Sequence, residues 1–86
     1  MLPALLKRML PRGKVDGDEY VALNPRRVDR HLGSFKINLT TGCWADFALD
    51  DTGGRDPISL VAYLHGVTRV EAARRLAMLV GVHDDR

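Results

Sequence analysis

The stretch SFKINLTTGCWADF, residues 34–47, decides the fold that we predict for this chain. Its first half alternates apolar and polar residues, which is the period-two pattern of a half-buried strand. The segment 40–42 fits a three-residue hairpin loop, with Gly42 in the left-handed position that such loops favour. The sequence therefore predicts a central β-hairpin over residues 34–48.

The loop length also predicts which residues face each other across this hairpin. Three apolar pairs would share one face: Leu39 with Cys43, Ile37 with Ala45, and Phe35 with Phe47. The other face would pair Asn38 with Trp44 and Lys36 with Asp46. A slip by one residue moves every side chain to the opposite face, so apolar side chains would enter water. We therefore expect Trp44 on the outer, polar face.

The segments before the hairpin predict a helix and a strand. Pro3 suits the first turn of a short helix within residues 1–11, whose apolar residues share one stripe. We expect this helix to cover the core as a lid. A polar turn follows, and residues 19–23 read as a strand.

Two helices are expected after the hairpin, beyond a flexible turn at Gly53 and Gly54. Asp56 suits the N-cap of the first helix, which should end at Gly66. Thr68 begins a capping box for the last helix. Its helical spacing predicts a buried stripe of Val70, Ala73, Leu76, Ala77 and Val80.

These elements predict a single α+β domain over residues 1–86. A small antiparallel sheet of about three strands, within residues 19–49, would be packed by the N-terminal helix and by a helical pair over 56–81, followed by a frayed tail at 82–86. A chain of 86 residues buries roughly 60% of the surface that it exposes when unfolded, so its core is thin. One cysteine excludes an internal disulfide framework, and three scattered histidines give no zinc-site spacing.

The charge is unevenly distributed along the chain. Residues 1–43 contain eight Lys or Arg and four Asp or Glu, whereas residues 44–86 contain five and seven. A basic first half can bind phosphates, with an affinity that falls as the salt concentration rises. The alternative interpretation is an ordinary solvated surface.

The order of these elements resembles the small zinc-ribbon domain at the N-terminus of bacterial-type DNA primases. In that family a CxxH pair precedes a Pro-Ser-Phe strand, a CxxC pair follows a hairpin, and Gly-Gly-Asp leads into a helix. Placing residues 33–35 on Pro-Ser-Phe sets four residues of this chain on the ligand positions: Asn24, Arg27, Asp46 and Leu49. Structural zinc requires Cys or His ligands, and neither Arg nor Leu can serve. The chain thus resembles the zinc-less variants in phage- and plasmid-type primase–helicases, and we expect no metal and no cofactor.

The absence of zinc implies another source of stability. A structural zinc couples about 10 kcal/mol or more of binding free energy to folding. Our hypothesis is that burial of Phe35, Phe47, the last helix and the lid helix compensates for it, at about 25 cal/mol per Å² of apolar surface.

The resemblance also implies a function, because in primases this domain is understood to help engage template DNA. We therefore expect a non-catalytic module of DNA replication that binds single-stranded DNA by cations and aromatic stacking. The candidate residues are Lys36 and Trp44 on the outer hairpin face and Arg26, Arg27 and Arg30 on the loop before it. Alternatively, Trp44 is covered by the chain around Tyr20, and Lys36 with Asp46 forms only a cross-strand pair.

A second hypothesis is a protein-interaction module that docks onto a primase or helicase partner through the lid helix or the Trp44 face. The sequence shows no pairing of a nucleophile with a base, so we do not expect an enzyme. No stretch approaches the roughly 20 apolar residues of a membrane span, and no cleavable leader is apparent, so we expect a cytoplasmic protein without a membrane partner.

Overall fold

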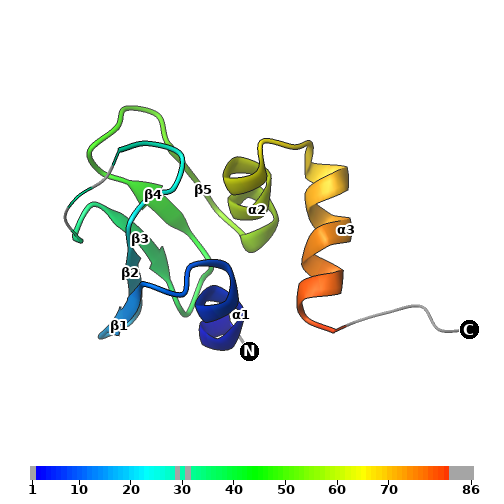
Figure 1. The fold of residues 1–86 in the computed structure, drawn as a ribbon, viewed down its shortest axis with the longest axis horizontal. Coiled ribbons are helices and arrows are strands. Elements are labelled where there is room, and N and C mark those ends of the chain that lie inside the picture. Colours follow the sequence, from blue (N-terminus) through cyan, green and yellow to red (C-terminus); the bar gives the residue numbers. More distant parts are fainter. Residues whose placement is uncertain (1, 29, 31, 82–86) are drawn as a thin grey trace, which may run out of the picture.

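A five-stranded antiparallel meander and three helices form the fold in the computed structural model, which describes residues 2–28, 30 and 32–81. The strands lie in the sheet in their order along the chain (Figure 1). Their bounds are β1 Lys14–Asp16, β2 Glu19–Ala22, β3 Phe35–Asn38, β4 Trp44–Asp46 and β5 Gly53–Gly54. The helices are α1 Leu2–Met9, α2 Pro57–His65 and α3 Arg69–Leu79.

The sheet has more strands than the three or so that we predicted. Residues 14–16, predicted to belong to a polar turn, pair with β2 as β1. Gly53 and Gly54, predicted to form a flexible turn, pair with β4 as β5. A Cβ at Gly54 would lie 2.5 Å from Nε1 of Trp44, so this strand requires a residue without a side chain.

The predicted lid helix is confirmed, because α1 packs on one face of the sheet (Figure 1). Leu6 is fully buried, and Leu10, just after the helix, is 6% exposed. The hydroxyl of Tyr20 in β2 donates a hydrogen bond of 2.6 Å to the Leu10 carbonyl oxygen, which attaches the end of the lid to the sheet.

The caps of the two C-terminal helices are confirmed. The Asp56 carboxylate accepts from the backbone N–H of Ser59, and Gly66 ends α2 with a φ of 66°. The Thr68 hydroxyl oxygen accepts from the backbone N–H of Glu71 in the first turn of α3. The tail at residues 82–86 lies outside the described part of the chain.

The buried stripe predicted for the last helix is wrong at its first two positions. Val70 is 73% exposed and Ala73 is also exposed, whereas the fully buried residue is Ala72. The reason is that α3 packs chiefly against α2, and α2 lies between α3 and the sheet (Figure 1). Leu76, Ala77 and Val80 are half-buried and border a groove shared with α1 and the β3–β4 loop.

The predicted register of the central hairpin is also wrong, by one residue. β3 and β4 pair Phe35 with Asp46, Lys36 with Ala45 and Ile37 with Trp44. Trp44 and Asp46 therefore face the core, where they are 6% and 1% exposed. Phe47, predicted to pack in the core, is 73% exposed.

The turn explains the shift. The loop holds four residues, 39–42, instead of three, because the backbone N–H of Asn38 donates to the Cys43 carbonyl oxygen at 2.7 Å. The Asn38 side-chain oxygen accepts from the backbone N–H groups of Thr40 and Thr41, both at 2.8 Å. Asparagine stabilises turns in this way, and Gly42 takes the expected left-handed conformation, with a φ of 81°.

The new register brings the largest aromatic side chain into the core. The Trp44 ring lies 5.0 Å from the Tyr63 ring and 6.2 Å from the Phe35 ring, centroid to centroid. Its indole N–H donates to the Ser59 hydroxyl at 2.9 Å, so the polar atom is satisfied. A buried Trp with a bonded N–H stabilises the core more than the smaller Phe47 would.

None of the described helices is long and apolar enough to cross a membrane.

This register can be tested by truncating each aromatic residue in turn. Trp44→Ala should lower the free energy of unfolding by about 3–5 kcal/mol, because it removes a buried aromatic side chain. Phe47→Ala should change it by no more than about 0.5 kcal/mol, because the side chain is exposed. Urea unfolding followed by circular dichroism measures both values. A larger loss of unfolding free energy for Phe47→Ala than for Trp44→Ala would instead support the pairing of Phe35 with Phe47.

Candidate nucleic-acid interface

A buried polar network joins the two loops at one end of the hairpin. The Asp46 carboxylate, whose side chain is fully buried, accepts from the Arg27 Nε at 2.7 Å and the Arg27 Nη2 at 3.2 Å. It also accepts from the Asn24 side-chain amide at 2.8 Å and the backbone N–H of Ala48 at 3.0 Å. A two-pronged arginine–carboxylate pair fixes geometry as well as charge.

The same network extends to the loop that carries the predicted arginines. The Asn24 amide also donates to the Tyr63 hydroxyl at 2.9 Å, and its oxygen accepts from the backbone N–H of Arg26 at 2.8 Å. The Arg27 Nη2 donates to the Ser34 hydroxyl oxygen at 2.8 Å. Among the described residues, no buried side-chain nitrogen or oxygen lacks a partner. The network therefore holds the start and the end of the loop between β2 and β3.

Three of the four residues set on zinc-ligand positions belong to this network: Asn24, Arg27 and Asp46. Leu49, the fourth, is 38% exposed and does not join their side chains. Within the described part of the chain, no group of three or more His, Cys, Asp or Glu residues could hold a metal ion. The hypothesis that burial of Phe35, Phe47, the last helix and the lid helix compensates for an absent zinc is wrong for Phe47, which lies outside the core. An ion pair and hydrogen bonds join Asn24, Arg27 and Asp46.

The charge of Asp46 follows from its partners. The hydrogen bonds from the Arg27 guanidinium hold the pKa of this carboxyl well below its usual range, with a further contribution from the Asn24 amide, against the opposing effect of burial. Asp46 is therefore ionised in the folded protein at neutral pH.

The outer face of the sheet is the face that α1 does not cover. Directly opposite residues on neighbouring strands share a face. Successive pairs place one row across all five strands: Lys14, Val21, Lys36, Ala45 and Gly53. The two lysines are two strand spacings apart, roughly 10 Å. Lys36 lies 3.7 Å from the Glu19 carboxylate, and both side chains are more than a third exposed, so this pair is weak.

Phe47 stands at one end of this face and is the residue that the sequence prediction missed. Its backbone N–H donates to the Ser34 carbonyl oxygen at 2.7 Å, beside the Arg27 contact. Phe47, Lys36 and Ala45 border one shallow hollow. The sequence signal that the prediction missed is the turn formed by the Asn38 side chain. This turn sets a register in which Trp44 faces inward and Phe47 faces outward.

The five predicted site residues thus fall into two groups. Lys36 and the loop residues Arg26 and Arg30 are accessible, and the Arg26 guanidinium lies 5.6 Å from the Tyr63 ring centroid. Arg27 is largely engaged by Asp46, and Trp44 is buried in the core. The prediction that Trp44 lies on the outer face is wrong, so it offers no surface to a base or a docking partner.

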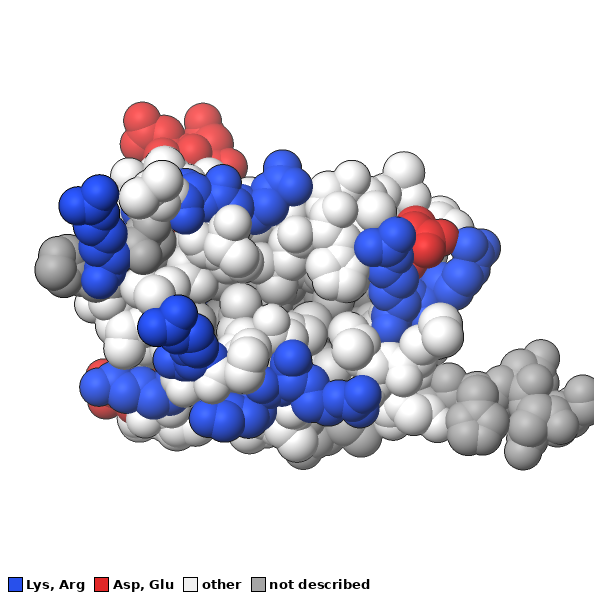
Figure 2. All heavy atoms as spheres, in the orientation of Figure 1, with Lys and Arg blue, Asp and Glu red and all other residues white. Residues whose placement is uncertain are grey.

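One face of the molecule is strongly basic. Figure 2 shows Lys and Arg over the sheet, over α1 and beside α3, with fewer acidic residues, which lie at the upper edge, at the lower left and beside α3. Residues 1–15 contain four Lys or Arg and no Asp or Glu, which contributes to this asymmetry.

No family model matches the chain, and no match was found among the curated proteins compared with it.

The contribution of Asp46 to stability should depend on pH. Because folding lowers its pKa, its contribution is fully present above about pH 4–5 and is lost as the pH falls toward the folded pKa. Asp46→Asn should lower the free energy of unfolding at pH 7 by about 3 kcal/mol, because Arg27 loses its counter-charge. The variant should also lose less stability than the wild type between pH 5 and pH 2.

Urea titrations at several pH values provide this comparison. Asp16→Asn, which alters an exposed carboxylate in β1, is the control. Parallel acid profiles for the wild type and Asp46→Asn would contradict the assignment.

Removal of divalent metal should leave the fold unchanged. The positions that would hold zinc in the primase domain are joined here by an ion pair and hydrogen bonds. We expect the same midpoint of urea unfolding with and without a strong chelator. A shift to lower urea in the chelator would show that a metal contributes to folding.

Proposed function

We propose that this chain is a non-catalytic module that binds single-stranded nucleic acid, as the resemblance to primase zinc-ribbon domains suggests. The observation that carries this proposal is Phe47, 73% exposed beside Lys36 on the outer face of the sheet. Single-strand sites combine cations that contact the backbone with aromatic rings on which bases stack. In this proposal Phe47 takes the role that the sequence assigned to Trp44.

The neighbouring residues suit such a contact. Ala45 continues the row from Lys36, and its small side chain leaves room for a base beside the Phe47 ring. Lys14 lies on the same face, and Arg30 is exposed on the loop that Arg27 anchors, whereas the Arg26 guanidinium lies over the Tyr63 ring of α2. Arg27 acts in this scheme as a positioning residue, because Asp46 engages its guanidinium.

The acidic loop sets a boundary to the proposed path. Asp50 and Asp51 border a hollow on the other side of Phe47 and would repel phosphates. The strand would therefore pass from the arginine-bearing loop across Phe47 toward Lys36 and Lys14. In a protein of DNA replication, this contact would hold a template for primase or helicase domains.

The proposal predicts the effects of two substitutions on the binding of labelled oligo(dT). Phe47→Ala should weaken binding by about 5- to 150-fold, the equivalent of one stacked base at ~1–3 kcal/mol. Lys36→Ala should reduce the steepness of the salt dependence by about 0.7 in log K against log salt, as expected for one lost phosphate contact. Fluorescence anisotropy at several salt concentrations measures both effects.

Two exposed residues elsewhere provide matched controls. Met78→Ala removes a side chain that is 72% exposed on α3, and Lys7→Ala removes a cation of α1, on the other side of the sheet. Neither should change the affinity by more than about twofold. No binding to any oligonucleotide at low salt would contradict the proposal. Salt-insensitive binding to a primase or helicase domain would favour the alternative of a protein-docking module.

A further inference from the structure

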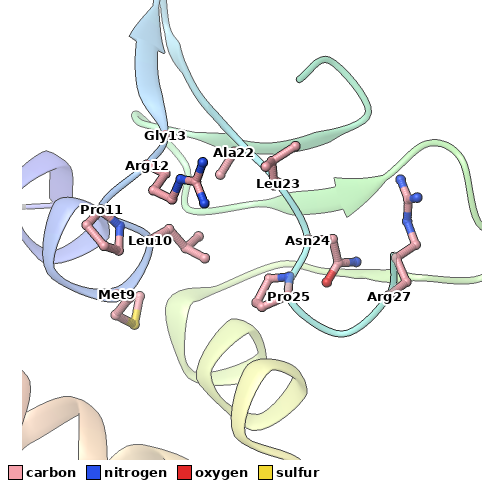
Figure 3. A pocket seen from close by; sticks show the side chains of 10 residues that line it. All are labelled: Met9, Leu10, Pro11, Arg12, Gly13, Ala22, Leu23, Asn24, Pro25 and Arg27. Carbon is pink, nitrogen blue, oxygen red and sulfur yellow. The ribbon is translucent and has the colours of Figure 1, made fainter. Parts of the chain in front are cut away.

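We infer a second binding site, for an acidic peptide with one bulky apolar side chain, in the pocket between the end of α1 and the end of β2. The pocket has a volume of about 340 Å³, which is within the range of ligand sites. Figure 3 shows the side chains that line it. Its walls are Met9, Leu10, Pro11, Arg12 and Gly13 on one side, and Ala22, Leu23, Asn24, Pro25 and Arg27 on the other.

The walls of this pocket are fixed before any ligand binds. On one side, the Leu10 carbonyl oxygen accepts from the Tyr20 hydroxyl at 2.6 Å and from the backbone N–H of Gly13 at 3.0 Å. A Cβ at Gly13 would lie 2.5 Å from the Tyr20 ring, so glycine permits this close approach. On the other side, Asn24 is held by Asp46. A preformed pocket loses less entropy when it binds.

Arg12 provides a cation at the rim of the pocket. Arg12 extends across it from the α1 side (Figure 3), and within the described residues its guanidinium meets no carboxylate. Lys7, Arg8 and Lys14 belong to the same acid-free segment, residues 1–15, but they do not line the pocket, and the Arg8 guanidinium donates to the Leu79 carbonyl oxygen at 2.7 Å. A ligand that places a carboxylate near Arg12 while its apolar group fills the pocket would match both the charge and the surface of the site.

The lining favours a peptide side chain over a nucleobase. Its apolar residues are aliphatic, so the pocket offers no ring on which a base could stack. The amide of Asn24 already donates to Asp46 and to Tyr63, and its oxygen accepts from the backbone N–H of Arg26. Apart from Arg12, the polar side chains of the lining are thus already engaged, so a base edge would lose most of its hydrogen bonds to water, whereas a Leu or Phe side chain would lose none.

A panel of fluorescent acidic peptides tests this inference on the full chain. Each peptide carries six Asp or Glu residues around one variable position, occupied by Leu, Ile, Met, Phe, Tyr, Trp or Ala. At least one bulky residue should bind about tenfold or more tightly than Ala, as measured by fluorescence anisotropy. Carbon–proton NMR spectra should show the largest methyl shifts at Met9, Leu10 and Leu23.

A pair of charge reversals separates the site from general electrostatics. Arg12→Glu should weaken binding of the best peptide by about tenfold relative to Arg55→Glu, which makes the same change in net charge outside the pocket. Both variants should bind oligo(dT) equally, because Arg12 is not part of the proposed nucleic-acid path. Circular dichroism confirms that both variants are folded.

Four results would overturn the inference. They are no binding by any peptide of the panel at millimolar concentration, equal binding of the Ala peptide, equal effects of the two charge reversals, and methyl shifts at Met9 and Leu23 caused by oligo(dT) in place of the peptide. The last result would show that a base occupies the pocket. Failure of oligo(dT) binding alone would contradict only the proposed function, because the two sites share no tested residue.

Discussion

The pair between Arg27 and Asp46 is the contact on which the arrangement of this small protein depends. It joins the loop before β3 to the last residue of β4, and Asn24, just after β2, adds a hydrogen bond to Asp46. Breaking a buried ion pair by removing one partner is costly, although replacing both partners with apolar residues can be neutral. The main effect of the pair is therefore to specify which segments meet, and its contribution to the net free energy of folding is small.

The hairpin register and this ion pair depend on each other. Asp46 can reach Arg27 beneath the loop because it faces inward, and it faces inward because Asn38 closes a four-residue turn. The same register buries Trp44 against Tyr63 and turns Phe47 outward. One turn thus decides which aromatic residue stabilises the core and which remains available at the surface.

The exposed aromatic residue and the apolar pocket occupy different parts of the surface. Phe47 and Lys36 lie on the outer face of the sheet, whereas Arg12 borders an apolar pocket beside α1. The loop that Arg27 anchors lies between these two areas. A domain with a thin core can thus present two chemically different surfaces, because its short strands and helices leave many side chains at the boundary. We propose that one surface binds a single strand and that the other binds an acidic partner segment.

The sequence by itself determined the α+β class, the lid helix, the central hairpin and the helix caps at Asp56 and Thr68, because these follow from local periodicity and capping chemistry. Tertiary structure decided the register, the edge strands β1 and β5, and the exposure of Val70 on α3. A register changes with a single residue in a turn, and the strand partners and helix faces depend on contacts between distant segments, which local patterns do not contain.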